Sequence, residues 1–250
     1  MSIFGLRMIR IKNIPVINNY PIEFTQDEIL ICQRIWDKKL TMTSMDSLIG
    51  TILACKYIIK EEIEGAFVEC GVWRGGHAIA AAAIFKLHGK QVQIYLYDTF
   101  AGMTEPTKND VYFHNDKLAI HTYELLKKEN FTDWCFSSLE EVKSNFNEFG
   151  ISENSLNFIK GDVLDSLAEE KNLPGMIAYL RLDTDWYEST KMELKILFPR
   201  LSNRGILVID DYAAWSGSKK ATDEYFDANS MPFLLPLDNG GRIGIKATIR

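Results

Sequence analysis

Two short stretches decide the fold: Leu180-Arg181-Leu182-Asp183-Thr184-Asp185-Trp186-Tyr187 and Val208-Ile209-Asp210-Asp211-Tyr212. Each acidic cluster directly follows an apolar run, residues 176–182 in the first case and residues 205–209 in the second. The segment between the two clusters has a helical pattern that closes between Pro199 and residue 205. An apolar strand, a helix and a second apolar strand predict a βαβ unit of a parallel sheet.

The acids of these stretches follow the carboxyl ends of the two strands. In an open α/β sheet these ends meet at one edge, where ligands bind. Asp183, Asp185, Asp210 and Asp211 are therefore expected to converge, and several carboxylates at one edge are typical of a cation site. The alternative is that each aspartate is an ordinary helix cap or turn residue.

Composition narrows the class of protein. The chain has 250 residues and a net charge of −6, which suits one α/β domain and does not indicate nucleic acid or an anionic membrane surface as partner. Its four cysteines include no C-x-x-C pair, so we expect reduced thiols. No secretory signal or stretch of membrane-spanning length is evident, and a cytoplasmic protein is predicted.

A glycine-rich turn lies between a short strand and a helix. Residues 66–70 form the predicted strand, Gly71-Val-Trp-Arg-Gly-Gly76 the turn, and residues 78–87 the Ala-rich helix. This order is typical of the nucleotide-binding half of a Rossmann-like fold. Trp73 replaces the second glycine of the dinucleotide fingerprint, which disfavours an NAD-dependent oxidoreductase. The alternative is a tight turn without a ligand.

Asp98 ends the next predicted strand, residues 92–97. An acid at this point of a Rossmann-like fold accepts hydrogen bonds from a ribose diol, although an ordinary turn residue is the alternative. The polar stretch 99–115 follows, and its length indicates a functional lid.

The remaining pattern predicts an α/β fold of the Rossmann-like class, with about seven mostly parallel strands, helices on both faces and a C-terminal antiparallel hairpin. Thr25 and Glu28 form a capping box, and the two helices before the first strand are expected to cap one edge of the core. We predict an N-terminal arm and cap helix over residues 1–40 and one domain over residues 41–250. The other predicted elements are helices 44–60, 117–128, 139–149, 165–171 and 219–228 and strands 156–160, 233–236 and 242–246.

Four motifs resemble those of the macrocin O-methyltransferase (TylF-like) family. They are the glycine turn from Glu69 to Gly76, residues 98–103, the Leu-Arg-Leu-Asp-Thr-Asp-Trp-Tyr-Glu-Ser-Thr run over 180–190, and residues 208–212. The resemblance spans about Thr41 to the C-terminus, in the same order. It implies a class I methyltransferase fold with S-adenosylmethionine as methyl donor and a divalent cation, usually Mg²⁺.

The resemblance also implies roles for single residues. The metal ligands would be Asp183, Asp210 and Asp211, with Asp183 also the general base. The donor would be bound by Thr41, Ser44, Glu69, Gly71, Arg74, Gly75, Asp98, Thr99, Asp162 and Asp183.

Such a protein would methylate a hydroxyl of a small-molecule sugar acceptor. A catechol-type O-methyltransferase and a non-catalytic donor-binding subunit are the alternatives. The arm at residues 1–24 is a candidate dimer contact. Site roles stay open for Asp185, His114, His121, Tyr187, Tyr212 and Lys219.

Overall fold

A seven-stranded sheet forms the centre of the computed structural model, which describes residues 20–226 and 232–247. The strand order is β5-β2-β1-β6-β7-β9-β8. The first five strands in this order run parallel, while β9 is antiparallel to both of its neighbours, β7 and β8. The strands are β1 (Ala66–Cys70), β2 (Ile94–Asp98), β5 (Leu156–Lys160), β6 (Ile177–Leu182), β7 (Leu201–Ile209), β8 (Leu235–Pro236) and β9 (Arg242–Ile245). The predicted mixed sheet with its antiparallel end is confirmed.

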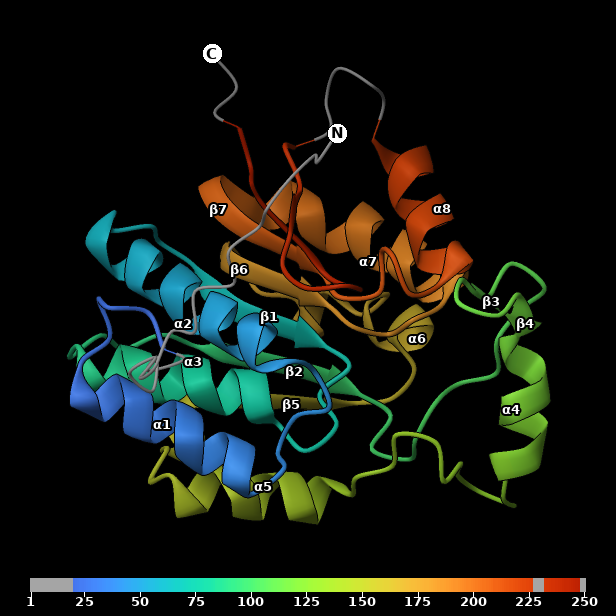
Figure 1. Cartoon of the computed structure of the whole chain (residues 1–250), viewed down its shortest axis with the longest axis horizontal. Helices are drawn as coiled ribbons and strands as arrows, with labels where there is room; N and C mark the ends of the chain where they lie inside the picture. The colour runs from blue at the N-terminus through green and yellow to red at the C-terminus, as the bar shows by residue number, and fades with distance from the viewer. Residues whose placement is uncertain (1–19, 227–231, 248–250) are drawn as a thin grey trace, which may run out of the picture.

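Helices cover both faces of this sheet (Figure 1). One face carries α1 (Gln26–Asp37), α2 (Met45–Lys60), α3 (Gly76–Leu87) and α5 (Leu139–Glu148). The other face carries α6 (Val163–Ser166), α7 (Tyr187–Leu197) and α8 (Ser216–Tyr225). The helices α1 and α2 were expected at one edge, but their apolar residues join those of α3 over a face of the sheet.

Local sequence explains how these helices begin. The Thr25 hydroxyl accepts from the Glu28 backbone N–H while the Glu28 carboxylate accepts from the Thr25 N–H, so the predicted capping box is confirmed. Ser44 caps α2 in the same way through the Ser47 N–H. All five residues of β1 are buried, as expected for a central parallel strand.

Several predicted boundaries were wrong; among them, α8 begins at Ser216 rather than residue 219, and β8 begins at Leu235 rather than residue 233. The strand β7 begins at Leu201 rather than residue 205, because buried Leu201 pairs with Ile177 before the polar residues 202–204 interrupt the apolar pattern. The helix predicted over 165–171 is instead the short α6 at Val163–Ser166, capped by Asp162, followed by a separate 3₁₀ turn at Glu170–Asn172. The helix α4 (Ala119–Leu126) begins two residues after the predicted start at residue 117, because β4 (Lys117–Leu118) pairs with β3 (Val111–Tyr112).

Residues 99–135, between β2 and α5, contain β3, β4 and α4 and are named here the lid segment; the lid predicted over residues 99–115 is its first part. In Figure 1, β3, β4 and α4 lie on the side to which the arrowheads of β1 and β2 point. The segment is anchored there. The buried Asp110 carboxylate accepts from the Tyr187 N–H at 2.8 Å, and the Ser216 hydroxyl accepts from the Val111 N–H at 3.0 Å. These contacts hold the segment against the starts of α7 and α8.

Other predictions lie partly outside the described residues. The arm over residues 1–24 is described only from Tyr20, and the helix predicted over 219–228 only to Phe226. The division into residues 1–40 and 41–250 stays a prediction, although Ile29, Cys32 and Ile35 of α1 are buried in the same apolar cluster as α2 and α3. None of the described helices is long and apolar enough to cross a membrane. Within the described ranges, short 3₁₀ turns also occur at Glu153–Ser155, Glu170–Asn172 and Phe198–Arg200.

Candidate functional site

The site lies where the strand order reverses, at the carboxyl ends of β1 and β6. Gly71 directly follows β1 and packs against the loop that follows β6. A Cβ added to Gly71 would stand 1.8 Å from the Asp183 carbonyl oxygen. Its φ of +82° also favours glycine. The turn then places Gly75, with φ +89°, at the start of α3. Only glycine therefore fits at position 71.

Asp98, at the end of the neighbouring strand β2, accepts hydrogen bonds from the backbone of the glycine turn. Its Oδ2 accepts from the backbone N–H groups of Val72 at 2.6 Å and Trp73 at 3.1 Å, and its Oδ1 accepts from Phe100 N–H at 2.7 Å. Burial raises the pKa of Asp98, and these N–H donors oppose that rise. Asp98 and the glycine turn, two separate signals in the sequence, are therefore in direct contact.

Two adjoining cavities open around these residues. The first, named here the β2 cavity, is lined by Gly71, Tyr97, Asp98, Thr99, Gly102, Met103, Thr104, Gly161, Asp162, Val163, Thr184 and Ser189. The second, the acidic cavity, is lined by Leu40, Thr41, Thr43, Ser44, Glu69, Val72, Gly76, His77, Asp210, Asp211, Ala214, Asp238, Asn239 and Gly240. Both are also lined by Met42, Trp73, Cys135, Asp183 and Asp185.

A buried arginine organises the acidic cavity. Arg181 has no exposed surface and contacts three carboxylates. Its Nε donates to Glu69 Oε1 at 3.1 Å, its Nη1 to Asp210 Oδ1 at 2.7 Å and its Nη2 to Asp183 Oδ2 at 2.7 Å. One cation from β6 thus holds acids from the ends of β1, β6 and β7.

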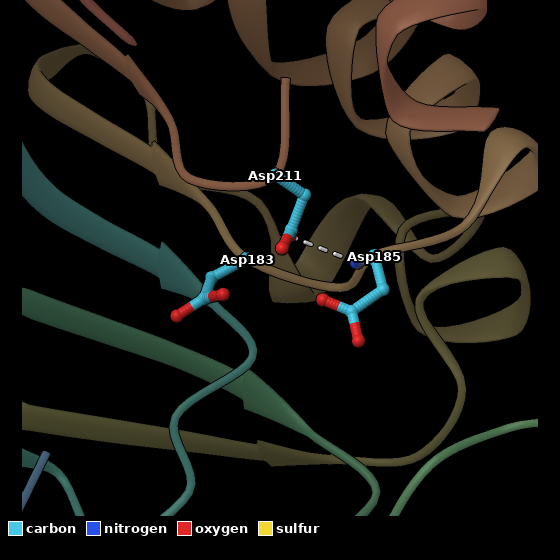
Figure 2. A group of neighbouring side chains, drawn as sticks. All are labelled: Asp183, Asp185 and Asp211. Atoms are coloured by element: carbon cyan, nitrogen blue, oxygen red, sulfur yellow. Dashed lines mark hydrogen bonds between the residues drawn. The ribbon is translucent and has the colours of Figure 1, made fainter. Parts of the chain in front are cut away.

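Asp183, Asp185 and Asp211 form the tightest group of acids. Each offers a carboxylate oxygen, and these oxygens all lie within 4.8 Å of one another. Figure 2 shows the three side chains at the ends of β6 and β7, with Asp211 Oδ2 accepting from the Asp185 N–H at 3.1 Å. Burial raises the pKa of all three carboxyl groups, and that of Asp185 rises to about 7. Asp210, a predicted ligand, lies beside this group but is turned toward Arg181.

The donor chemistry of these residues fits a divalent cation. Hard cations such as Mg²⁺ take carboxylate and water oxygens, and the acids of the cavity supply the former. Glu69 fits the ammonium group of an amino-acid ligand. It is 2% exposed, and its Oε2 has no hydrogen-bond partner in the part of the chain that the structure describes. A buried carboxylate oxygen without a partner is costly, and a bound ammonium would satisfy it.

Two predicted donor residues lie outside the cavity walls. The Arg74 Nε stands 3.1 Å from Glu141 Oε1 of α5. Gly75 forms the N-cap of α3 and lines neither cavity. Asp162 does line the β2 cavity, but its Oδ1 accepts from the Leu164 N–H at 2.9 Å as a helix cap. Thr41 and Ser44 line the acidic cavity.

Five of the six residues with open roles line neither cavity. The Tyr187 hydroxyl donates to Glu224 at 2.5 Å, and the Tyr212 hydroxyl donates to Asp223 at 2.8 Å. The Lys219 ammonium pairs with Asp223, and His114 packs against Tyr112. These four residues and His121 line neither cavity, whereas Asp185 lines both.

Sequence reasoning missed several wall residues. Asp238 comes from the hairpin turn and accepts from the Ser44 hydroxyl at 2.8 Å. His77 of α3 is buried between the hydroxyls of Thr43 and Thr51, each at 2.8 Å. Cys135 ends the lid segment. The glycines after Asp238 predicted a turn, but only the folded chain brings that turn to the cavity.

The strand order and the two cavities at the strand ends define a Rossmann-like class I methyltransferase fold. The family described as macrocin-O-methyltransferase (TylF) matches residues 36–239, and the chain belongs to this family. The predicted family is therefore confirmed.

Named relatives support the same assignment. The chain is 31% identical over 182 residues to the 8-demethyl-8-(2,3-dimethoxy-alpha-L-rhamnosyl)-tetracenomycin-C 4'-O-methyltransferase of Streptomyces olivaceus, with 69% of this chain and 62% of that protein covered. It is 31% identical over 169 residues to the demethyldecarbamoylnovobiocin O-methyltransferase of Streptomyces niveus, with 67% and 60% covered. The chain thus spans about three fifths of the length of both relatives.

Solved structures agree with the fold. The O-methyltransferase NovP aligns with a TM-score of 0.71 at 28% identity, covering 83% of this chain and 82% of that one. The calicheamicin methyltransferase CalS11 aligns with a TM-score of 0.61 over 90% of this chain and 94% of that one. Its 18% identity supports the fold alone.

Proposed function

We propose that this protein is an S-adenosylmethionine-dependent O-methyltransferase that acts on a hydroxyl of a sugar, in a glycosylated natural product, a nucleotide-sugar or a polysaccharide precursor. One observation carries the proposal: Asp183 and Asp185 line both the β2 cavity and the acidic cavity. A donor whose nucleoside lies in the β2 cavity and whose amino-acid part reaches the acidic cavity would therefore carry its methyl group past these two acids, where an acceptor hydroxyl would meet it. Both relatives are named as O-methyltransferases, and the name of the first contains a rhamnosyl compound, which supports a sugar acceptor.

The β2 cavity would hold the nucleoside part of the donor. Asp98 and Thr99 would face the ribose, and Asp162 would lie near the base. Glu69 Oε2 would accept from the donor's ammonium group, with Thr41 and Ser44 near its carboxylate. Gly71 leaves the backbone room that a close ligand needs.

The acidic cavity would hold a divalent cation, Mg²⁺ or a similar ion. We assign Asp183, Asp210 and Asp211 as its ligands, and Asp185 lies close enough to join them. A bound cation lowers the pKa of the acceptor hydroxyl that it contacts and fixes the direction of its lone pair.

A carboxylate must then take the hydroxyl proton. The acceptor oxygen takes the methyl group as the carbon–sulfur bond breaks and leaves its electron pair on sulfur. Asp183 is the predicted base. Asp185 is the second candidate, and geometry favours it, because Arg181 already donates to Asp183 Oδ2 while Asp185 receives no such ion pair from the described residues. A carboxylate paired with a guanidinium is the weaker base.

Transfer of a labelled methyl group tests the proposal. Purified protein is incubated with S-[methyl-³H]adenosylmethionine and Mg²⁺, against a panel of deoxysugar glycosides, nucleotide-sugars and catechols. We expect label on a sugar hydroxyl, and loss of transfer with excess EDTA. Label on catechols alone would assign the catechol-type reaction instead. No binding of the donor by calorimetry, with or without Mg²⁺, would overturn the proposal.

A further inference from the structure

The carboxylates that Arg181 holds belong to two different parts of the site. Glu69 stands at the end of β1 on the proposed donor side, while Asp183 and Asp210 follow β6 and β7 on the proposed cation side. Arg181 itself is at the centre of this arrangement, on β6, and is fully buried. Its three contacts range from 2.7 to 3.1 Å.

Arg181 contacts one oxygen of each carboxylate and leaves the other. It binds Glu69 Oε1, Asp210 Oδ1 and Asp183 Oδ2. In the described ranges, Glu69 Oε2 is buried without a hydrogen-bond partner. Each acid therefore has one oxygen held by Arg181 and one oxygen that Arg181 does not contact. A carboxylate held in this way needs no further ordering when the ligand arrives.

We propose that Arg181 is a positioning residue shared by the two ligands. It orients Glu69 toward the ammonium group of the methyl donor and orients Asp183 and Asp210 toward the divalent cation. This inference rests on the proposed function. Its consequence is that the affinities for donor and cation both depend on one guanidinium that touches neither ligand.

The shape of the side chain makes this inference testable. A guanidinium is a planar fork of five N–H donors, and here three of its nitrogens reach acids from three strands. A lysine ammonium has the same charge but is a single point on a flexible stem. Arg181→Lys therefore keeps the charge of the site and removes the geometry.

Binding measurements on the folded protein separate the roles. S-adenosylhomocysteine and Mn²⁺ are titrated separately by calorimetry into wild type, Arg181→Lys and Arg181→Gln, after circular dichroism establishes the fold of each. We expect Arg181→Lys to weaken the binding of both ligands about 10-fold to 100-fold. If Arg181 had only a structural role, its variants would have a lower melting temperature, but the folded variants would bind both ligands with the affinities of wild type. Arg200→Lys, which alters an ion pair with Glu170 outside both cavities, is the control and should change neither affinity.

Carboxylate variants complete the test. We expect Glu69→Gln to weaken S-adenosylhomocysteine and spare Mn²⁺, and Asp210→Asn to do the reverse, so that only an Arg181 variant affects both. Affinities within twofold of wild type in Arg181→Lys, or loss of one ligand alone, would overturn the proposal. So would failure of both Arg181 variants to fold, since the role would then be structural. If wild type itself binds neither ligand, the proposed function fails first.

Discussion

At the scale of single residues, backbone conformation marks the site. Asp185 has a φ of +67°, in the left-handed region that non-glycine residues seldom adopt. Trp73 at +46° and Cys135 at +52° share this feature, and all three line both cavities. Strained residues of this kind gather at functional sites, where the surrounding contacts hold them in place. The Asp185 N–H, bonded to Asp211, is one such contact.

Replacing the two candidate bases distinguishes their roles. We expect Asp183→Asn to weaken Mn²⁺ binding about 10-fold or more, because a cation ligand loses its charge. We expect Asp185→Asn to lower kcat about 100-fold or more with a smaller change in Mn²⁺ affinity, because the proton acceptor is lost. Calorimetry and steady-state kinetics measure the two effects.

Asp116→Asn is the matched control for Asp185. Asp116 also has a positive φ, +54°, but it is exposed and lies in the lid outside both cavities. Its variant should keep wild-type kcat. If Asp185→Asn also keeps wild-type kcat, Asp185 is not the base.

At the scale of elements, Glu28 joins three helices. Its buried carboxylate caps α1, lies 2.8 Å from the Lys56 ammonium of α2 and 3.2 Å from His88 Nε2 at the end of α3. Burial by itself raises the pKa of Glu28, but Lys56, the Thr25 N–H and His88 outweigh burial, and the pKa is lowered. The ionised form is therefore the one that stabilises the fold.

Glu28→Gln should lower the free energy of unfolding at pH 7 by about 1–3 kcal/mol, since hydrogen bonds to a charged group are lost. A carboxyl with a lowered folded-state pKa stabilises above its unfolded pKa and loses that contribution as pH falls through the folded value. The difference between wild type and variant should thus shrink below about pH 4. Urea unfolding at several pH values measures it.

Asp27→Asn serves as the control for Glu28. Asp27 lies in the same first turn of α1 but is exposed. Its loss should cost no more than about 1 kcal/mol. A difference between wild type and Glu28→Gln that is constant from pH 7 to pH 3 would contradict this account.

Asp110 connects the lid segment to α7. It is fully buried and accepts from the Thr107 N–H at 2.6 Å, the Thr107 hydroxyl at 2.9 Å and the Tyr187 N–H at 2.8 Å. Asp110→Asn would place an amide donor against one of these donors, and we expect a loss of about 1–3 kcal/mol in stability. Because α7 starts two residues after Asp185, we also expect a lower kcat.

Thermal unfolding and kinetics on the same preparation measure both effects. Asp133→Asn, which changes an exposed lid acid paired with Lys128, should leave both near wild type. A variant at Asp110 with the stability and kcat of wild type would mean that the anchor does not position the α7 start.

The elements that the sequence predicted best have strong local signals. The strands at 66–70 and 156–160 match their predicted bounds, and the caps at Thr25 and Ser44 set the starts of α1 and α2. The start of β7 was missed because the polar residues 202–204 interrupt the apolar pattern after Leu201, although Leu201 is buried and pairs with Ile177 of β6. Strand pairing of this kind depends on partners far away in the chain.

At the scale of the whole molecule, contacts between distant segments explain what the sequence could not predict. The glycine turn, Asp98 and the aspartates at 183, 210 and 211 follow strands directly, so strand order alone places them at one edge. Asp238 and Cys135 reach the cavities by folding of the hairpin turn and the lid. In the sequence, Arg181 is a single charged residue inside an apolar strand. Its three carboxylate partners become visible only when β6 is placed between β1 and β7.

The central claim is that a methyl donor and a divalent cation bind side by side, with Asp183 between them. A crystal structure with S-adenosylhomocysteine and Mn²⁺, measured with anomalous scattering, tests it most directly. We predict the nucleoside in the β2 cavity with its ribose at Asp98, and an anomalous peak about 2.2 Å from oxygens of Asp183 and Asp211. A nucleoside bound elsewhere, or an acidic cavity without an anomalous peak at saturating Mn²⁺, would contradict the claim.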